Sequence, residues 1–307
     1  MAPLQDISLI ALRYFVSVAE EKNFTRAAQR MHIAQPALSR QISKLEAALQ
    51  TPLFLRSSRG VDLTEAGEVL LTRAYTIFNQ IEQTVNDVTS QSHSPRGVVT
   101  VGLPPTPGEL IAPPLLDYIR KNYPDIELRF REGFSGDLLR MLKQNEIGVA
   151  VMHDAPPEDM FISTNLLREH LWVIGKAGTI DRPSYTLAEA VKLPLVMPSR
   201  PNFLRFLIDR HAEQHNLQLN VIHRSDGIWI TKALVRYGLG YTILTYGGVL
   251  SEMQHGTVDA VPITDPQINW TLCTTIHRDQ ANKPAPQLVI RAIKTIVDDL
   301  VAREIWK

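Results

Sequence analysis

The chain has 307 residues, of which 44% are hydrophobic and 21% charged, and its 32 basic and 32 acidic side chains cancel. This length predicts about two domains, and the composition is typical of a globular protein with a substantial core. No segment approaches the roughly 18 unbroken apolar residues of a transmembrane helix, and the first residues lack the pattern of a secretion signal, so we expect a cytoplasmic protein. The lone cysteine, Cys273, excludes an internal disulfide and a cysteine-based metal cluster; we expect it to be an inert core residue.

The neutral total conceals a basic segment near the N-terminus. Between residues 22 and 59 the only acid is Glu46, against seven basic side chains: Lys22, Arg26, Arg30, Arg40, Lys44, Arg56 and Arg59. A segment with this balance suits a polyanionic partner.

Three short helices are predicted in this region. Apolar residues at helical spacing predict a first helix from Leu9 to about Glu21, Thr25 is a reasonable N-cap for a second helix over 25–32, and a third spans 35–49. The second and third helices are separated by only a few residues, which is the pattern of a helix-turn-helix.

The third helix has two distinct faces. Its apolar residues recur at four, three and four positions and must face inward: Leu38, Ile42, Leu45 and Leu49. The outward face is formed by Gln35, Ser39, Arg40, Ser43 and Lys44, side chains that can read base edges in a major groove or bind phosphate. On these residues alone, an ordinary solvated helix face remains an alternative.

A small hairpin wing is predicted next. Residues 52–56 have strand character, 57–60 form a turn and 61–63 return, with Arg59 at the tip within reach of a phosphate or minor groove.

A long amphipathic helix follows. Its apolar stripe runs through Leu70, Ala74, Ile77, Ile81, Val85 and Val88. Such a stripe needs a partner, and a second copy of the chain is favoured over a place in the core of the next domain because no neighbouring segment offers a complementary long helix. A polar, turn-rich segment then ends the helix.

The remaining chain reads as an α/β body of two lobes. Strands and helices alternate from 98 to 152 and again from 171 to 244, and the chain returns through a strand at 270–276 and a closing amphipathic helix. Ligands of such sheets lie beyond the carboxyl ends of strands, here 104–107, 133–135, 152–154 and 198–203. Helix N-termini at two of these loops suit an anion, and a small carboxylate is the favoured ligand. Arg200 as a plain surface cation and Thr106 as a plain cap are the alternatives.

Four sequence stretches resemble one known family. The segments 12–16, 23–28, 32–41 and 63–67 (LRYFV, NFTRAA, HIAQPALSRQ and LTEAG) resemble the winged helix-turn-helix of LysR-type transcriptional regulators. Ala34 departs from the Ser or Thr often found there. The segments around 103–108 and 133–137 look closest to members that regulate nitrogen assimilation or aromatic-compound breakdown.

The resemblance implies an architecture and a function. We expect a winged helix-turn-helix over 1–64, a linker and dimerisation helix over 65–90, a hinge over 91–97, and a two-lobed α/β effector domain like that of periplasmic binding proteins over 98–307. Lobe I would take about 98–167 and 269–307, and lobe II about 168–268. The expected function is effector-controlled, sequence-specific binding of double-stranded promoter DNA, without a cofactor, membrane or enzymatic activity.

The resemblance also implies site residues and partners. DNA contacts are expected from Gln35, Pro36, Ser39, Arg40 and Arg59, and the outward face of the third helix adds Lys44 to this set. Effector contacts are expected from Thr106, Phe134, Ser135, Ser199, Arg200 and Asn202. The family further implies a homodimer through the linker helix, a dimer of dimers, and contact with RNA polymerase.

Three other classes of protein match parts of this sequence. An enzyme finds its best support in His211 and His215, one helical turn apart, but the intervening glutamate is misplaced for a zinc-protease motif and no third ligand is evident. An exported solute-binding protein needs a signal sequence and no basic helix-turn-helix. A constitutive DNA-organising protein would have no use for the large α/β body, and it remains the alternative to an effector-controlled regulator.

Overall fold

The computed structural model describes residues 7–57, 60–89 and 95–307. It divides into two compact units, Met1–Val88 and Thr89–Lys307, and each is considered by itself. The predicted wing-tip residue Arg59 and most of the predicted hinge lie outside the described residues. None of the described helices is both long and apolar enough to cross a membrane.

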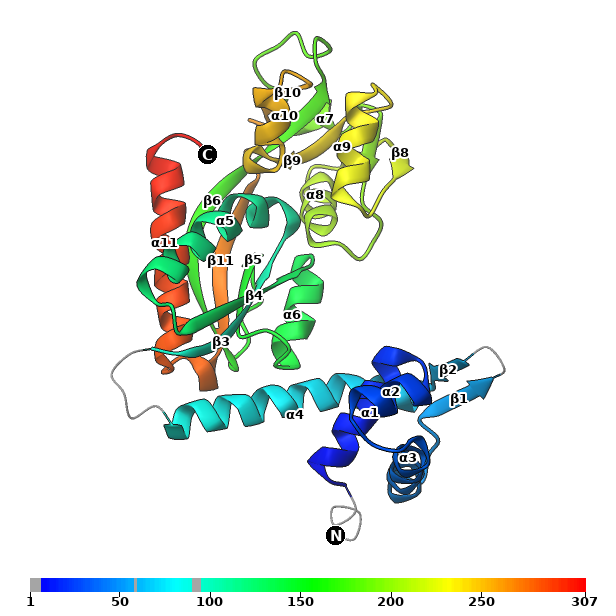
Figure 1. Ribbon diagram of the computed structural model, residues 1–307. Coiled ribbons are helices and arrows are strands. Elements are labelled where there is room, and N and C mark those ends of the chain that lie inside the picture. Colours follow the sequence, from blue (N-terminus) through cyan, green and yellow to red (C-terminus); the bar gives the residue numbers. More distant parts are fainter. Residues whose placement is uncertain (1–6, 58–59, 90–94) are drawn as a thin grey trace. The chain divides into compact units, whose positions relative to one another are not determined.

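The first unit has three short helices, a hairpin and a long helix (Figure 1). In chain order these are α1 (Leu9–Glu21), α2 (Phe24–Arg30), α3 (Gln35–Leu49), β1 (Phe54–Ser57), β2 (Gly60–Leu63) and α4 (Glu65–Thr89). The predicted bounds of the third helix are confirmed. The predicted cap of the second helix was wrong: Asn23, rather than Thr25, accepts from the backbone N–H groups of Thr25 and Arg26. Either residue type can cap a helix, so the sequence left this boundary open.

The core of the first unit lies among α1, α2 and α3. Leu38, Ile42 and Leu45 are fully buried there, as the spacing predicted. Ala74 of α4 belongs to the same core, with Leu70 and Ile77 packed against it. The first half of α4 is therefore a part of this unit and not a free connector.

The second unit contains a seven-stranded sheet and a separate two-stranded sheet. Its elements are β3 (Gly97–Leu103), α5 (Pro105–Asn122), β4 (Ile126–Glu132), α6 (Ser135–Lys143), β5 (Val149–His153), β6 (Phe161–Lys176), α7 (Leu187–Ala190), β7 (Leu195–Met197), α8 (Phe203–Gln214), β8 (Val221–Arg224), α9 (Ile228–Arg236), β9 (Thr242–Thr245), η2 (Tyr246–Val249), α10 (Leu250–Gln254), β10 (Val258–Pro262), β11 (Asn269–His277), η3 (Arg278–Gln280) and α11 (Pro284–Ala302). The large sheet has the order β10-β6-β11-β5-β3-β4, and β9 also pairs with β6. The β4-β3-β5 pairings are parallel, as the alternation of strands and helices predicted.

Lobe I is a three-layered arrangement. Buried residues of α5 and α11 pack on one face of the β3 and β5 strands, and those of α6 pack on the other with Met152 and Cys273. Cys273 is 3% exposed, as expected of a core residue, and its thiol donates to the Met152 carbonyl at 3.3 Å. Lobe II has its own core around β7, β9, α8 and the second half of β6.

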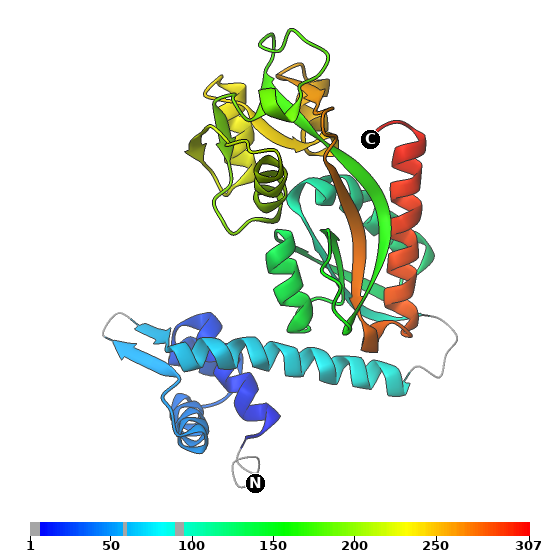
Figure 2. The same cartoon turned by 180° about the vertical axis from the view of Figure 1, so that it is seen from behind.

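The long strand β6 runs through both lobes (Figure 2): its first half pairs with the antiparallel strand β11, and its second half pairs with β9 and β10 of lobe II. The pattern predicted only the second half of β6, because residues 161–170 alternate weakly in hydrophobicity. The register between β6 and β11 shifts by one residue at Leu272 and Cys273: Leu167 pairs with Leu272, whereas Asn165 pairs with Cys273. Leu166 is therefore the extra residue of a β-bulge.

Candidate functional site

The outward face of α3 carries the predicted DNA-contacting residues. Gln35, Pro36, Arg40 and Lys44 are exposed, and Ser39 is half-buried. These five residues line one shallow concave surface together with Ser43 and Ala47. No side chain caps the helix at Ala34.

The cationic groups on this face are not paired with acids. Arg40 Nε donates only to the Pro36 carbonyl of its own helix, at 3.3 Å. Within the described part of the chain, neither Arg40 nor Lys44 makes an ion pair. Both charges therefore remain available for phosphate or for guanine.

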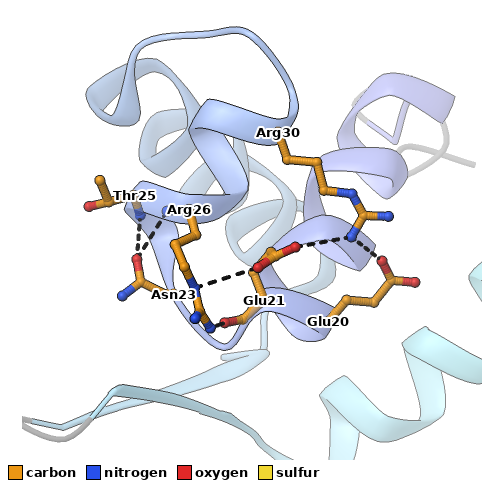
Figure 3. A network of polar contacts seen from close by, with 6 residues as sticks. All are labelled: Glu20, Glu21, Asn23, Thr25, Arg26 and Arg30. Atoms are coloured by element: carbon orange, nitrogen blue, oxygen red, sulfur yellow. Dashed lines mark hydrogen bonds and ion pairs between the residues drawn. The ribbon is translucent and has the colours of Figure 1, made fainter.

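The arginines of α2 are, in contrast, neutralised by acids at the end of α1 (Figure 3). Arg30 Nη1 lies 2.5 Å from Glu20 Oε2 and 3.4 Å from Glu21 Oε1. Arg26 Nε lies 3.5 Å from Glu21 Oε2, and a second nitrogen donates to the Glu21 carbonyl. The hydrogen bond that Arg30 donates to Glu20 raises the pKa of Arg30 above its ordinary value.

Among the basic side chains of residues 22–59 that the structure describes, the two without an acidic partner, Arg40 and Lys44, thus both lie on α3. The charge count over residues 22–59 missed this distinction because Glu20 and Glu21 stand just before that window. Two acids at the carboxyl end of a helix oppose the helix dipole, and this could have indicated that basic partners lie nearby.

A cavity of about 80 Å³ lies between the two lobes of the second unit. Four of the six predicted effector residues line it: Thr106, Phe134, Ser135 and Asn202. The rest of its wall is formed by Pro104, Pro105, His153, Pro198, Phe203, Leu204, Ser225, Asp226, Ile228, Thr231, Thr242, Leu244, Thr245, Gly248 and Trp270.

The other two predicted effector residues do not line this cavity. Arg200 binds Asp209, with Nη2 and Nε at 2.6 and 2.7 Å from Oδ2, and Arg205 Nε lies 2.9 Å from Asp209 Oδ1. The backbone N–H of Ser199 donates to Asp226 Oδ1 at 2.7 Å. Both residues therefore order the loop before α8 in this structure.

Several wall residues were not predicted individually. His153 ends β5, within a strand end that the sequence did indicate, and its ring stacks on Trp270 at 3.8 Å between centroids. Thr242 begins β9 and is 1% exposed, yet its hydroxyl has no hydrogen-bond partner among the described residues. Trp270 and Thr242 come from strands distant in sequence, so only the folded sheet brings them together.

Four helices begin at the cavity wall. The first turns of α5, α6 and α9 contribute Thr106, Ser135 and Ile228, and that of α8 contributes Phe203 and Leu204. Helix N-termini carry partial positive charge, which favours a negatively charged or acceptor group in the cavity.

The histidine pair of the enzyme reading is part of a helix end. His215 follows α8, and its Nδ1 lies 2.8 Å from the His211 carbonyl. Burial lowers the pKa of His211 below its ordinary value, and Arg210 and His215 add to this effect. Among the described residues, no group of three or more His, Cys, Asp or Glu side chains is arranged to hold a metal ion.

Comparison with known families decides the classification. The family "Bacterial regulatory helix-turn-helix protein, lysR family" matches residues 9–68, and "LysR substrate binding domain" matches residues 92–297. The chain belongs to the LysR family of transcriptional regulators. This confirms the fold and the regulatory function that the sequence predicted.

Full-length relatives agree with this assignment. The nitrogen assimilation regulatory protein Nac of Klebsiella aerogenes is 30% identical over 97% of this chain and 96% of its own. The regulator BbuR of Bordetella bronchiseptica is 29% identical over 96% of this chain and 89% of its own. Both names describe regulatory proteins, in agreement with the assignment of this chain to a family of transcriptional regulators, which are not enzymes. The fold is also that of CbnR in complex with its target DNA, with a TM-score of 0.73 at 19% identity, covering 94% of this chain and 100% of that one.

Proposed function

We propose that this LysR-family regulator reads promoter DNA with the outward face of α3 and is controlled by a small anionic metabolite in the cavity between the lobes. The observation that carries the first part is the unpaired charge of Arg40 and Lys44, beside the hydrogen-bonding side chains of Gln35 and Ser39. Lys and Arg contacts to phosphate give affinity, and base contacts give sequence preference. Arg59 and Pro36 complete the proposed DNA-contacting set.

The effector site is proposed to comprise Thr106, Phe134, Ser135 and Asn202, which line the cavity. Ser199 and Arg200 would act from the adjoining loop through Asp226 and Asp209. An effector shifts the arrangement of the regulator only if it binds one arrangement more tightly than another.

The proposed assembly is a homodimer through α4 and a dimer of dimers. Its support is the apolar stripe of α4. This stripe continues beyond the part that packs on the winged helix-turn-helix (α1 to β2, called the head below), and Val85 in the continuation is 53% exposed. Two heads related by a two-fold axis would read two half-sites, so the operator would be approximately palindromic. Action in the cytoplasm and contact with RNA polymerase are further parts of the proposal, and both rest on the family.

Selection of genomic fragments by the purified full-length protein, followed by footprinting with and without small carboxylic acids, tests this function. A two-fold protected site whose length changes with one acid supports it. Binding without sequence preference at every salt concentration would contradict it. Specific binding that no acid alters would favour the constitutive DNA-organising alternative.

A further inference from the structure

We infer that the cavity binds a compact monocarboxylic acid with an apolar body, and that His153, held in place by Glu169 and Trp306, binds its acid group. This inference rests on the proposed effector-responsive function and names the ligand class and the residue that selects it. Neither Glu169 nor Trp306 lines the cavity itself, so both are positioning residues.

Glu169 is a buried carboxylate with a separate partner for each oxygen. It lies on β6 and is 1% exposed. His153 Nε2 lies 2.6 Å from Oε2, and Trp306 Nε1 donates to Oε1 at 2.8 Å. A buried carboxylate without such partners would be strongly disfavoured. The arrangement therefore holds the three side chains as one group.

This group fixes the orientation of the His153 ring. Trp270 covers one face of the ring, with 15° between the planes, and the His153 backbone N–H donates to Ser135 Oγ at 3.2 Å. An ionised carboxylate only accepts hydrogen bonds, so Glu169 keeps a hydrogen on Nε2. Nδ1, which has no partner among the described residues, is the ring atom left for a ligand.

A carboxylic acid matches the polar groups that remain. It shares one proton with Nδ1, either as the neutral acid donating to the ring or as the carboxylate accepting from the protonated ring. Its second oxygen can accept from the Thr242 hydroxyl, which is buried and otherwise without a partner in the described chain. The four helix N-termini at the cavity wall also favour a negative charge on the ligand.

The charge of the wall limits the ligand to one negative group. The described residues that line the cavity include no lysine or arginine, and one of them, Asp226, adds a negative charge. Prolines at positions 105 and 107 also remove two backbone donors from the first turn of α5. Phosphate and polycarboxylates would therefore be left without compensating cations.

The size and lining of the cavity limit the body of the ligand. A cavity of about 80 Å³ is small beside the ~150 Å³ engineered cavity that takes up benzene. Phe134, Phe203 and Leu204 are among its apolar wall residues. A short aliphatic body therefore fits this environment better than a sugar or nucleotide.

Trp306 ties this site to the C-terminal tail. It is 1% exposed, and its indole packs against Gly247 in the turn after β9. A Cβ atom at Gly247 would lie 2.7 Å from Trp306 Nε1, so the close approach requires glycine there. The next residue, Gly248, lines the cavity. Trp306 thus supports both Glu169 and the turn beside the site.

The ligand class is tested by calorimetric titration of the full-length protein. The probes are acetate, propanoate, 2-methylpropanoate and benzoate, their neutral amides, and phosphate and citrate. We expect at least one monocarboxylate to bind tenfold or more tightly than its amide, and no binding of phosphate or citrate. Absence of binding by all four acids, or competition by citrate, overturns the ligand class. An acid that binds but leaves every DNA footprint unchanged contradicts the proposed function and not this inference.

The roles of the residues are tested with His153→Gln, Glu169→Gln and Trp306→Phe, with Trp229→Phe, on the exposed side of α9, as the matched control. The readout is the ratio of acid to amide affinity. We expect His153→Gln to reduce this ratio tenfold or more and the two positioning variants about threefold or more, with unliganded DNA binding unchanged. A structural role alone would weaken acid and amide equally, and an unchanged ratio in all three variants overturns the assignment. Glu169→Gln keeps the side-chain size, so the test stands if Trp306→Phe folds poorly.

Discussion

The Tyr75 hydroxyl donates a hydrogen bond to Glu20 Oε1 at 2.7 Å, while the other oxygen of Glu20 binds Arg30. Tyr75 lies on α4, Glu20 at the end of α1 and Arg30 on α2. One carboxylate thus joins the linker helix to the first helix of the helix-turn-helix. In this conformation the Arg30 guanidinium is bound to Glu20 and is therefore kept from DNA phosphate.

Replacing Glu20 by Gln should leave Arg30 with only its longer contact to Glu21, at 3.4 Å, and so make it more available for phosphate. We expect tighter binding to a duplex of arbitrary sequence. The slope of log K against log salt should become steeper by up to about 1, since each new phosphate contact adds roughly 0.9. Fluorescence anisotropy between 50 and 200 mM salt, as an order-of-magnitude working range, measures this slope. Glu213→Gln on α8 makes the same charge change outside the head; an equal effect in both variants would reject a specific role for Glu20.

The outward face of α3 should decide sequence preference. Ser39→Ala and Arg40→Ala should each cost about 1–3 kcal/mol of binding to the selected operator, and Arg40→Ala should relax the preference at one base position. Gel-shift titrations against operator and scrambled duplexes give both quantities. Arg210→Ala, an exposed cation on α8, is the control. Wild-type footprints in both α3 variants would show that another surface reads the bases.

A buried ion pair in lobe II should be sensitive to the loss of one partner. Lys232 Nζ lies 3.1 Å from Glu252 Oε2, with side chains 4% and 10% exposed. Lys232→Met leaves a buried carboxylate without its cation and should destabilise the fold by about 3–5 kcal/mol, whereas adding Glu252→Leu should restore most of the loss. Urea unfolding measures both. Lys294→Met breaks an exposed pair with Asp298, so a loss there as large as in Lys232→Met would contradict the role of burial.

Acid stability should depend on Glu189. Hydrogen bonds from Thr186 and Arg182 lower its pKa from 4.5 to about 2. A carboxylate with a lowered pKa contributes stability above the unfolded-state value, and this contribution is lost as the pH falls from about 4.5 through about 2. Glu189→Gln should therefore flatten the dependence of stability on pH across this window. Thermal unfolding curves at several pH values check it, and an unchanged dependence would assign the acid transition to other groups.

The sequence predicted elements whose residues interact locally. The inward spacing of Leu38, Ile42 and Leu45 determined the third helix, because helical periodicity is a local property. The lobes followed from alternating strands and helices for the same reason. The first half of β6 was not predicted because it lacks the alternation that marks a strand: the seven successive residues 162–168 are all exposed or half-buried.

Side-chain partnerships across long sequence distances were not predictable. Arg200 was expected at the effector, but its partner Asp209 comes from the next helix and holds it in the loop. Glu169 and Trp306 are 137 residues apart and meet only in the folded lobe. A single charged residue or a terminal tryptophan forms no sequence pattern from which a contact with a distant residue can be predicted.

The bulge at Leu166 also sets which side chains of β6 point inward. Successive residues of a strand face opposite sides, so one extra residue exchanges the two faces for the strand beyond it. Glu169 lies three residues after Leu166. With the extra residue in place, its side chain is on the side of the strand where it reaches His153 and Trp306. Deleting Leu166 would restore a regular ladder and turn Glu169 away from both. The contacts of Glu169 with His153 and Trp306 thus depend on one extra residue in a strand whose own sequence carries no functional motif.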